Sequence, residues 1–181
     1  DAVRIAEYAY LKRETITLTH KPLKGIFTLK SLLGERKHYV KLKSSLLARK
    51  DALNQYESHE SRERRNKAIE LLLKNIDALE KQIKSVIDEN PEISRNYKLI
   101  RSVKGIGLVN AVNTIVYTNN FTSFQTARQY ACYCGIAPFE HKSGTSIKGR
   151  TMVSTIGCHQ LKAELSMAAR SAIINDPWLR K

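Results

Sequence analysis

The stretch from Ser102 to Ala111 carries residue types that could bind a phosphate. Gly105 and Gly107 stand two positions apart between two segments with helical character. Glycine can adopt a positive φ, and it lets a foreign backbone approach closely. The amides that follow lie at a helix N-terminus, where unpaired donors and the helix dipole favour an anion. Lys104 adds a positive charge, so the stretch predicts a phosphate contact.

A turn of this kind is typical of helix-hairpin-helix modules, which hold nucleic-acid backbones without reading bases, but a plain helix–helix corner also produces it. The charge of the surrounding segment favours the first interpretation. Between Arg95 and Lys162 the chain has nine lysines and arginines and one acid, Glu140, within a formal net charge of +14. Protein surfaces normally mix both signs. The segment therefore predicts polyanion binding that weakens steeply with salt.

A second group of candidates lies in the segment 139–150, which is rich in serine, threonine, glycine and cations. It has no periodic apolar face, so the sequence predicts a loop. Ser143 follows Lys142, and Lys148 and Arg150 are a few positions away. These cations could stabilise a pentacoordinate phosphate, but serine is a weak nucleophile and no neighbour is an obvious base. From the residues alone, a serine that forms a turn remains the alternative.

Three cysteines, Cys132, Cys134 and Cys158, make an odd number, which predicts reduced thiols in a cytosolic protein. Together with His159 they suggest a zinc site, but their spacing fits no standard knuckle, and apolar neighbours favour buried thiols. No run of eighteen apolar residues is present, so the sequence predicts no membrane span.

Two long helices are expected before the glycine turn, over about 26–58 and from about 66 to Asn90. The first repeats apolar residues every seven positions, at Leu32, Tyr39, Leu46 and Leu53, with Leu42 and Tyr56 on the intervening row. The second alternates spacings of three and four, at Ile69, Leu72, Ile76, Leu79, Ile83 and Val86.

These heptads are typical of a coiled coil, and the short polar turn between them predicts an antiparallel hairpin. Glu70 with Lys74, and Glu80 with Lys84, are expected to form supporting ion pairs four residues apart. The seams could close on each other or on a second copy of the chain. Because a lone two-helix hairpin buries little surface, dimerisation through this arm is the favoured interpretation.

The remaining helices are expected over about 94–103, 108–117 and 157–175. Another is expected to end near Cys134, with Thr122 and Gln125 as its capping box and Gly135 as its left-handed C-terminal residue. The sequence therefore predicts an all-α chain, in which a long antiparallel coiled-coil arm precedes a compact helical domain with a helix-hairpin-helix.

Several separate motifs resemble, in their order, the C-terminal domain of the DEDD-type insertion-sequence transposases, a family that includes the bridge-RNA-guided recombinases and the Piv-type DNA invertases. The resemblance covers about residues 97–172. The motifs are Val103-Lys104-Gly105-Ile106-Gly107, Phe124 to Tyr130, Tyr133-Cys134-Gly135-Ile136-Ala137-Pro138, Ser143-Gly144-Thr145-Ser146, Gly149-Arg150 and Ile156-Gly157.

The resemblance implies a catalytic serine and a metal site. Ser143 would attack a DNA phosphate, with Ser146 as the reserve candidate and His141 as a proton carrier or a surface residue without a role. Family members begin with a ribonuclease-H-like domain whose four acids bind Mg²⁺. The stretch from Asp1 to Ala6 matches the context of the fourth acid, so Asp1 would be that ligand and the other three would lie upstream. A single carboxylate hardly holds Mg²⁺, so no metal is expected in this chain alone.

These expectations divide the chain into three parts: 1–25 as the end of the missing domain and a linker, 26–93 as the arm, and 94–181 as the transposase domain. The expected function is DNA cleavage and rejoining by a bacterial cytoplasmic protein that associates with the nucleoid when bound to DNA. This part alone is expected to be inactive.

The expected partners are DNA, a guide RNA that could supply specificity, and a homodimer or higher oligomer. Lys104, Gly105, Gly107, Lys142, Lys148 and Arg150 are the expected nucleic-acid contacts. The alternative is a non-catalytic nucleic-acid-binding and dimerisation module, and a weaker alternative is an assembly domain with a basic surface.

Overall fold

The computed structural model describes residues 1–15, 22–53, 56–140, 142–143 and 147–179. These residues are mostly helical, as the sequence predicts. The helices are α1 (Ala2–Leu11), α2 (Lys24–Leu53), α3 (His59–Asp88), α4 (Pro91–Arg101), α5 (Leu108–Tyr117), α6 (Ala127–Tyr133) and α7 (His159–Asn175). The strands are β1 (Pro138–Phe139), β2 (Lys142–Ser143), β3 (Ile147–Lys148) and β4 (Met152–Val153).

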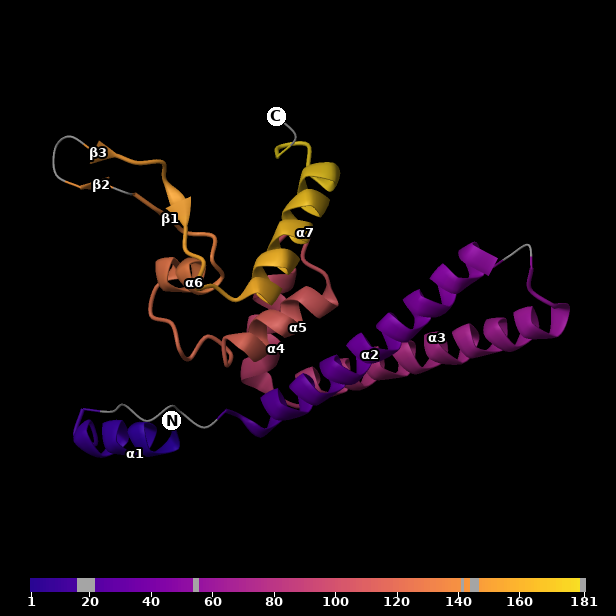
Figure 1. The fold of residues 1–181 in the computed structure, drawn as a ribbon, viewed down its shortest axis with the longest axis horizontal. Helices are drawn as coiled ribbons and strands as arrows, with labels where there is room; N and C mark the ends of the chain where they lie inside the picture. Colours follow the sequence, from indigo (N-terminus) through magenta and orange to yellow (C-terminus); the bar gives the residue numbers. More distant parts are fainter. Residues whose placement is uncertain (16–21, 54–55, 141, 144–146, 180–181) are drawn as a thin grey trace.

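Helices α2 and α3 form a long arm, in which they run side by side in opposite directions (Figure 1). The predicted row of α3 faces inward, since Ile76, Leu79 and Ile83 are buried. The prediction that Leu42 and Tyr56 form an intervening apolar row along the seam is wrong, because Leu42 is 41% exposed and Tyr56 is 85% exposed. The helical arm is thus observed, whereas its pairing as a coiled coil stays a prediction.

Ion pairs fix the register of the arm. The predicted pair within α3 forms, with Glu70 Oε1 2.9 Å from Lys74 Nζ. The pair predicted between Glu80 and Lys84 is wrong, because Glu80 accepts from Arg36 of α2 at 2.7 Å. Heptad spacing within one helix cannot reveal a partner on the other helix, so only the packed hairpin shows this contact.

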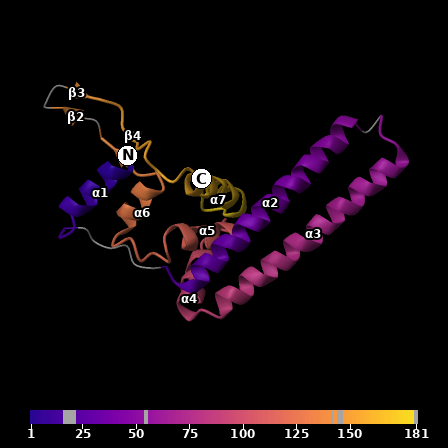
Figure 2. The same cartoon turned by 60° about the horizontal axis from the view of Figure 1, so that its bottom comes forward.

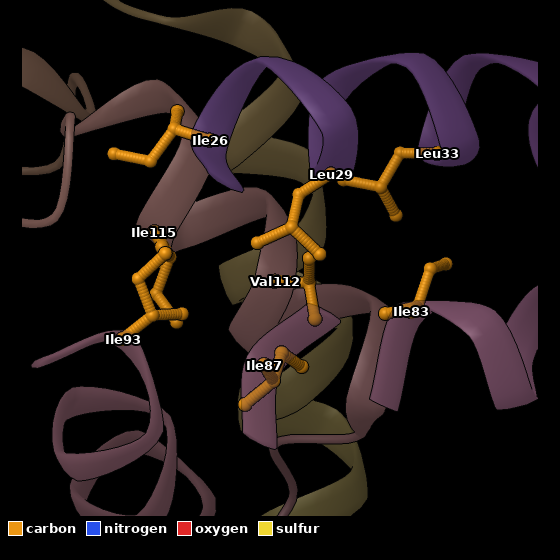
Figure 3. Packing of buried hydrophobic residues seen from close by; sticks show 8 residues of the cluster. All are labelled: Ile26, Leu29, Leu33, Ile83, Ile87, Ile93, Val112 and Ile115. Carbon is orange, nitrogen blue, oxygen red and sulfur yellow. The ribbon is translucent and has the colours of Figure 1, made fainter. Parts of the chain in front are cut away.

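A cluster of buried hydrophobic residues lies at the base of the arm, where α2 and α3 meet α4 and α5 (Figure 3). Burial of these aliphatic side chains stabilises the junction by roughly 1.5–3 kcal/mol for each side chain. The cluster contains Ile26, Leu29, Leu33, Ile83, Ile87, Ile93, Val112 and Ile115. The arm and the α4–α5 corner therefore share one core. This core holds the corner in a fixed position beside the N-terminal end of α2.

The α6 helix begins later than expected. Thr126 is its N-cap and forms the capping box with Gln129, so the capping box predicted at Thr122 and Gln125 is wrong. Both pairs have the same spacing, and sequence alone does not choose between them. Gly135 follows the helix with φ +67°, which confirms its predicted left-handed conformation.

Helix α7 packs against α5 and is buried along part of one side. Leu161, Ala168 and Ala172 are buried, whereas Ala169 and Ile173 are exposed. Asp176 is the residue at which the helix ends. In the described part of the chain, no helix has the length and apolar character that crossing a membrane requires.

Candidate nucleic-acid interface

The α4–α5 corner contains the predicted turn, and Gly105 adopts the predicted positive φ of +89°. A Cβ atom at Gly105 would lie 2.3 Å from the backbone oxygen of Ala168 and 2.9 Å from the backbone nitrogen of Ala172. Both atoms belong to α7. Within this chain the close backbone approach at Gly105 therefore serves packing against α7, and its predicted contact with nucleic acid stays a prediction.

Gly107 plays a different role in the same corner. It precedes α5 in an extended conformation, with φ −85° and ψ 176°, and supplies no side-chain cap. A Cβ atom here would meet nothing within 4 Å. An uncapped helix start leaves amide donors directed outward, where an anion is favoured. Of the two glycines, Gly107 is thus the one beside open space.

Lys104 projects from the turn with a 63% exposed side chain, but it has a partner. Its Nζ lies 3.1 Å from Oδ2 of Asp176, at the end of α7. The hydrogen bond from Lys104 lowers the pKa of the Asp176 carboxyl. A phosphate at Lys104 would have to replace this carboxylate. No spacing along the chain indicates this pair, because the two residues are far apart in the sequence.

The segment predicted as a loop after Pro138 contains two pairs of short antiparallel strands, so this prediction is corrected. Strand β1 pairs with β4, and β2 pairs with β3 beyond them. The segment thus forms an extended β-hairpin. Such short strands lack the periodicity by which sequence analysis recognises a strand.

The β2–β3 pair brings several candidate residues together. Lys142 is the cross-strand partner of Lys148, and Ser143 is the partner of Ile147. Like charges at opposing positions destabilise a strand pair, unless an anion lies between them. This register favours a polyanion at the hairpin. Ser146 and His141 lie outside the described residues.

The predicted contacts fall into two groups. Lys104, Gly105 and Gly107 lie at the α4–α5 corner, whereas Lys142, Ser143 and Lys148 lie on the hairpin, and the exposed Arg150 lies between its strands β3 and β4. In both views the hairpin projects away from the helices that form the corner (Figures 1 and 2). A nucleic acid that contacts both groups must therefore extend from one to the other.

The described residues do not form a Mg²⁺ site by themselves. Asp1 precedes α1, a helix without a buried residue, and nowhere in the described ranges do three or more histidines, cysteines or acids gather as metal ligands. Mg²⁺ needs several oxygen ligands, so Asp1 alone does not fit it. The metal role of Asp1 stays a prediction.

The three cysteines are free thiols. Cys134 is fully buried, and burial is the main cause that raises the pKa of its thiol. Burial likewise raises the pKa of the neighbouring Tyr130 to about 12. For Cys134 this confirms the interpretation of a buried thiol.

Exchanging Lys148 for glutamate is expected to stabilise the hairpin and weaken DNA binding at the same time. The new carboxylate would face Lys142, an opposite-charge pair that stabilises strands by about 0.2–1 kcal/mol. One lost phosphate contact would lower the slope of log affinity against log salt by about 0.9 for duplex DNA. Amide hydrogen exchange of the hairpin and a salt titration measure the two effects.

Lys148→Gln is the matched control, because it removes the repulsion without adding an attraction. It should weaken binding less than the glutamate variant. Unchanged DNA affinity in both variants would remove Lys148 from the interface.

Sequence analysis missed a groove at the base of the arm, between α2, α5 and α7. Its volume is about 560 Å³. Lys30 and Lys37 of α2 line it, and Lys37 Nζ donates to Gln160 Oε1 of α7 at 3.2 Å. The groove has no sequence signal, since its walls come from three helices that are distant along the chain.

Glu164 of α7 lies in the wall of this groove and is held by amides. Its Oε1 accepts from Asn113 Nδ2 and from Gln160 Nε2, both at 2.6 Å. Its backbone oxygen accepts from Asn110 Nδ2 at 2.9 Å. Burial raises the pKa of the Glu164 carboxyl, although the two side-chain hydrogen bonds oppose this.

Replacing Glu164 with glutamine is expected to raise the melting temperature at neutral pH. Because the pKa of Glu164 is higher in the folded chain than in the unfolded chain, its contribution to stability is complete below the unfolded pKa and declines as pH rises through the folded pKa. A gain of about 2–4 °C corresponds to roughly 1 kcal/mol in a chain of this size. Thermal melts across pH should show this gain shrinking as the pH falls.

Glu63→Gln, at an exposed position of α3, serves as the control and should leave the melting temperature nearly unchanged at each pH. A gain for Glu164→Gln that is absent at neutral pH, or that grows on acidification, would contradict the account.

Residues 97–181 match the protein family described as Transposase IS116/IS110/IS902, which is the class that the corner and the hairpin fall within. Over these residues the chain is similar to the domain of that family. The matched residues include all the candidate contacts named above, whereas Asp1 and the whole arm lie outside them.

Individual proteins are similar over a longer stretch. The pilin gene-inverting protein of Moraxella bovis is 28% identical over 169 residues, which are 93% of this chain and 51% of that protein. A 43.6 kDa protein of insertion element IS110 from Streptomyces coelicolor is 34% identical over 103 residues, 57% of this chain and 24% of its own length. A probable family 20 transposase of Pseudomonas aeruginosa is 26% identical over 119 residues, 62% of this chain and 34% of its own. The match with proteins named as gene-inverting covers nearly all of this chain. It covers only about half of those proteins, so the chain spans about half of their length.

Proposed function

We propose that this chain is part of a DNA transposase or site-specific recombinase that cleaves and rejoins DNA strands. The observation that carries the proposal is the pairing of β2 with β3, in which Lys142 stands opposite Lys148 within the residues that match the transposase family, and Ser143 follows Lys142 along the chain. Cations this close along the chain to a serine could stabilise a phosphate that its hydroxyl attacks. The relative from Moraxella bovis, named as gene-inverting, points to the same class of chemistry.

In this proposal Ser143 is the nucleophile. Its Oγ forms a bond to the phosphorus of the DNA backbone, and the bond from that phosphorus to a deoxyribose oxygen breaks. The hydroxyl proton passes, in net balance, to the departing sugar oxygen. The link between Ser143 and the DNA is itself a phosphodiester. The hydroxyl at the end of another strand can therefore attack it, which rejoins the DNA and releases the serine. Ser146 remains the reserve nucleophile.

Lys142, Lys148 and Arg150 would neutralise the phosphate in the transition state, while the α4–α5 corner positions the DNA. At the corner, a phosphate would meet the amides after Gly107 and draw Lys104 from Asp176. The module would then act as a helix-hairpin-helix, and Gly105 would hold it against α7.

The Mg²⁺ of this proposal requires ligands beyond the described residues, with Asp1 as one contributor. When bound, the ion would supply Lewis-acid activation of the phosphate or of the attacking hydroxyl. This chain by itself would bind DNA without cleaving it.

The arm would join copies of the protein. Leu42 of α2 and Leu71 and Leu73 of α3 are exposed, and such apolar side chains suit a second arm. We also propose a bacterial cytoplasmic location with association with the nucleoid, and a guide RNA as the source of sequence specificity, because contacts to the backbone alone carry none.

The proposal is tested by incubating the full-length protein and Mg²⁺ with DNA that carries the ends of its element. Strand cleavage and rejoined products are expected. DNA binding without any cleavage would favour the alternative, a non-catalytic module that binds nucleic acid and dimerises. An absence of salt-dependent binding would leave only an assembly domain.

A further inference from the structure

The two helices of the arm differ sharply in charge. Helix α2 has eight lysines and arginines and two acids, whereas α3 has seven and six. The described acids of α3 are partly neutralised within the arm, as in the pairs Glu70–Lys74 and Asp77–Lys81. On α2, the described ion pairs include only Arg36. The outer side of α2 therefore presents a row of cations that the arm itself does not neutralise.

Part of this row borders the groove at the base of the arm. Lys30 and Lys37 are exposed and lie two helical turns apart, about 10 Å along the axis of α2. The same face continues with Lys41, four residues beyond Lys37. Long, flexible lysine side chains at this spacing can reach phosphates of one backbone.

The wall beneath these cations is largely apolar. Leu33, Val40, Val109 and Val116 line it, and Tyr117, 42% exposed, lines it at the end of α5. Glu164 is the acid in this wall, and its carboxylate is already held by the amides of Asn113 and Gln160. The positive charge of Lys37 also lowers the pKa of Glu164, so a phosphate at Lys37 would compete with this carboxylate, which the two amides already hold.

From this combination we infer that the groove is a second nucleic-acid site, and that it binds a single-stranded segment of DNA. Phosphates would contact Lys30 and Lys37, while bases would lie against the aliphatic wall and stack on Tyr117. The inference rests on the proposed function, in which strand cleavage creates unpaired DNA.

A single strand fits this groove better than the other occupants do. The bases of a duplex are stacked inside it, so a duplex would place only phosphates and sugars over the apolar wall. A single strand exposes base faces, which aromatic and apolar side chains bind without regard to sequence. A second copy of the chain, with a net charge of +14, would meet like charges at Lys30 and Lys37, and the contact between arms proposed above uses other residues, Leu42, Leu71 and Leu73.

The test measures binding of a labelled oligothymidine, of a duplex hairpin and of an RNA with the oligothymidine's sequence to the full-length protein. The groove variants are Lys30→Gln with Lys37→Gln, and separately Tyr117→Leu. The control is Lys67→Gln with Lys84→Gln, two exposed lysines of α3. Circular dichroism confirms that each variant is folded.

The lysine pair is expected to weaken oligothymidine binding about tenfold or more and to lower the salt slope by about 1.4, the value for two phosphates of a single strand. Tyr117→Leu should weaken it as well, with the salt slope unchanged. Duplex binding and the α3 control should change less than twofold.

Equal losses for the groove variant and the α3 control, or for single-stranded and duplex DNA, would overturn the inference. Tighter binding of RNA than of DNA would overturn the assignment to DNA. A Lys142→Gln variant run in parallel separates the two proposals, because it should weaken duplex binding and leave the groove intact. If the groove variants bind oligothymidine as tightly as the wild type does, while Lys142→Gln weakens duplex binding, this inference is refuted and the proposed function stands.

Discussion

Replacing Ser143 with alanine is expected to abolish strand cleavage by the full-length protein, with a loss of at least about 1000-fold. Removing the nucleophile of a covalent mechanism eliminates the intermediate, and the residual rate comes from binding and electrostatics alone. DNA affinity should stay within about twofold, because the cations at the hairpin remain. Single-turnover cleavage assays and binding titrations measure the two quantities.

Ser146→Ala is the matched control, since it removes a hydroxyl from the same segment three residues further on. It should retain cleavage within about tenfold. If Ser146→Ala abolished cleavage and Ser143→Ala did not, the reserve candidate would be the nucleophile. Full activity in both variants would exclude a serine mechanism at this hairpin.

Replacing Gly105 with alanine is expected to lower the free energy of unfolding by about 2–5 kcal/mol. A left-handed conformation costs a residue with a Cβ about 1–2 kcal/mol, and overpacking typically costs a further 1–3 kcal/mol. The added atom would lie 2.3 Å from the Ala168 oxygen, so α5 and α7 would have to separate. Chemical denaturation measures the loss.

Gly107→Ala is the control for the same chemical change, because its φ is −85° and a Cβ would meet nothing within 4 Å. Its stability should change by less than about 1 kcal/mol, since a weaker N-cap is offset by lower entropy of the unfolded chain. If the corner binds phosphate, this variant weakens DNA binding while the fold stays intact. Equal destabilisation by both variants would contradict the packing argument.

The sequence predicted those features that depend on local periodicity or on single residues. The spacing of Ile76, Leu79 and Ile83 marked the buried face of α3, and the glycine turn marked the α4–α5 corner. The positive φ of Gly105 and Gly135 followed from helix ends that need a left-handed residue.

Contacts between distant segments were not predictable in this way. The Arg36–Glu80 and Lys104–Asp176 pairs each depend on how two helices pack, and no spacing in the sequence encodes that. The β2–β3 pair was missed because two-residue strands are too short to show alternation. The groove at the base of the arm likewise exists only once three helices have assembled.

The most direct test of the central claim is to identify the residue that becomes joined to DNA. The full-length protein, Mg²⁺ and DNA with the element's ends would be quenched with denaturant, digested with trypsin and analysed by mass spectrometry. Cleavage after Lys142 and Lys148 releases the peptide 143–148, which contains both candidate serines. A nucleotide on Ser143 is the predicted result. Cleaved DNA without any protein adduct would contradict the claim and point to attack by water.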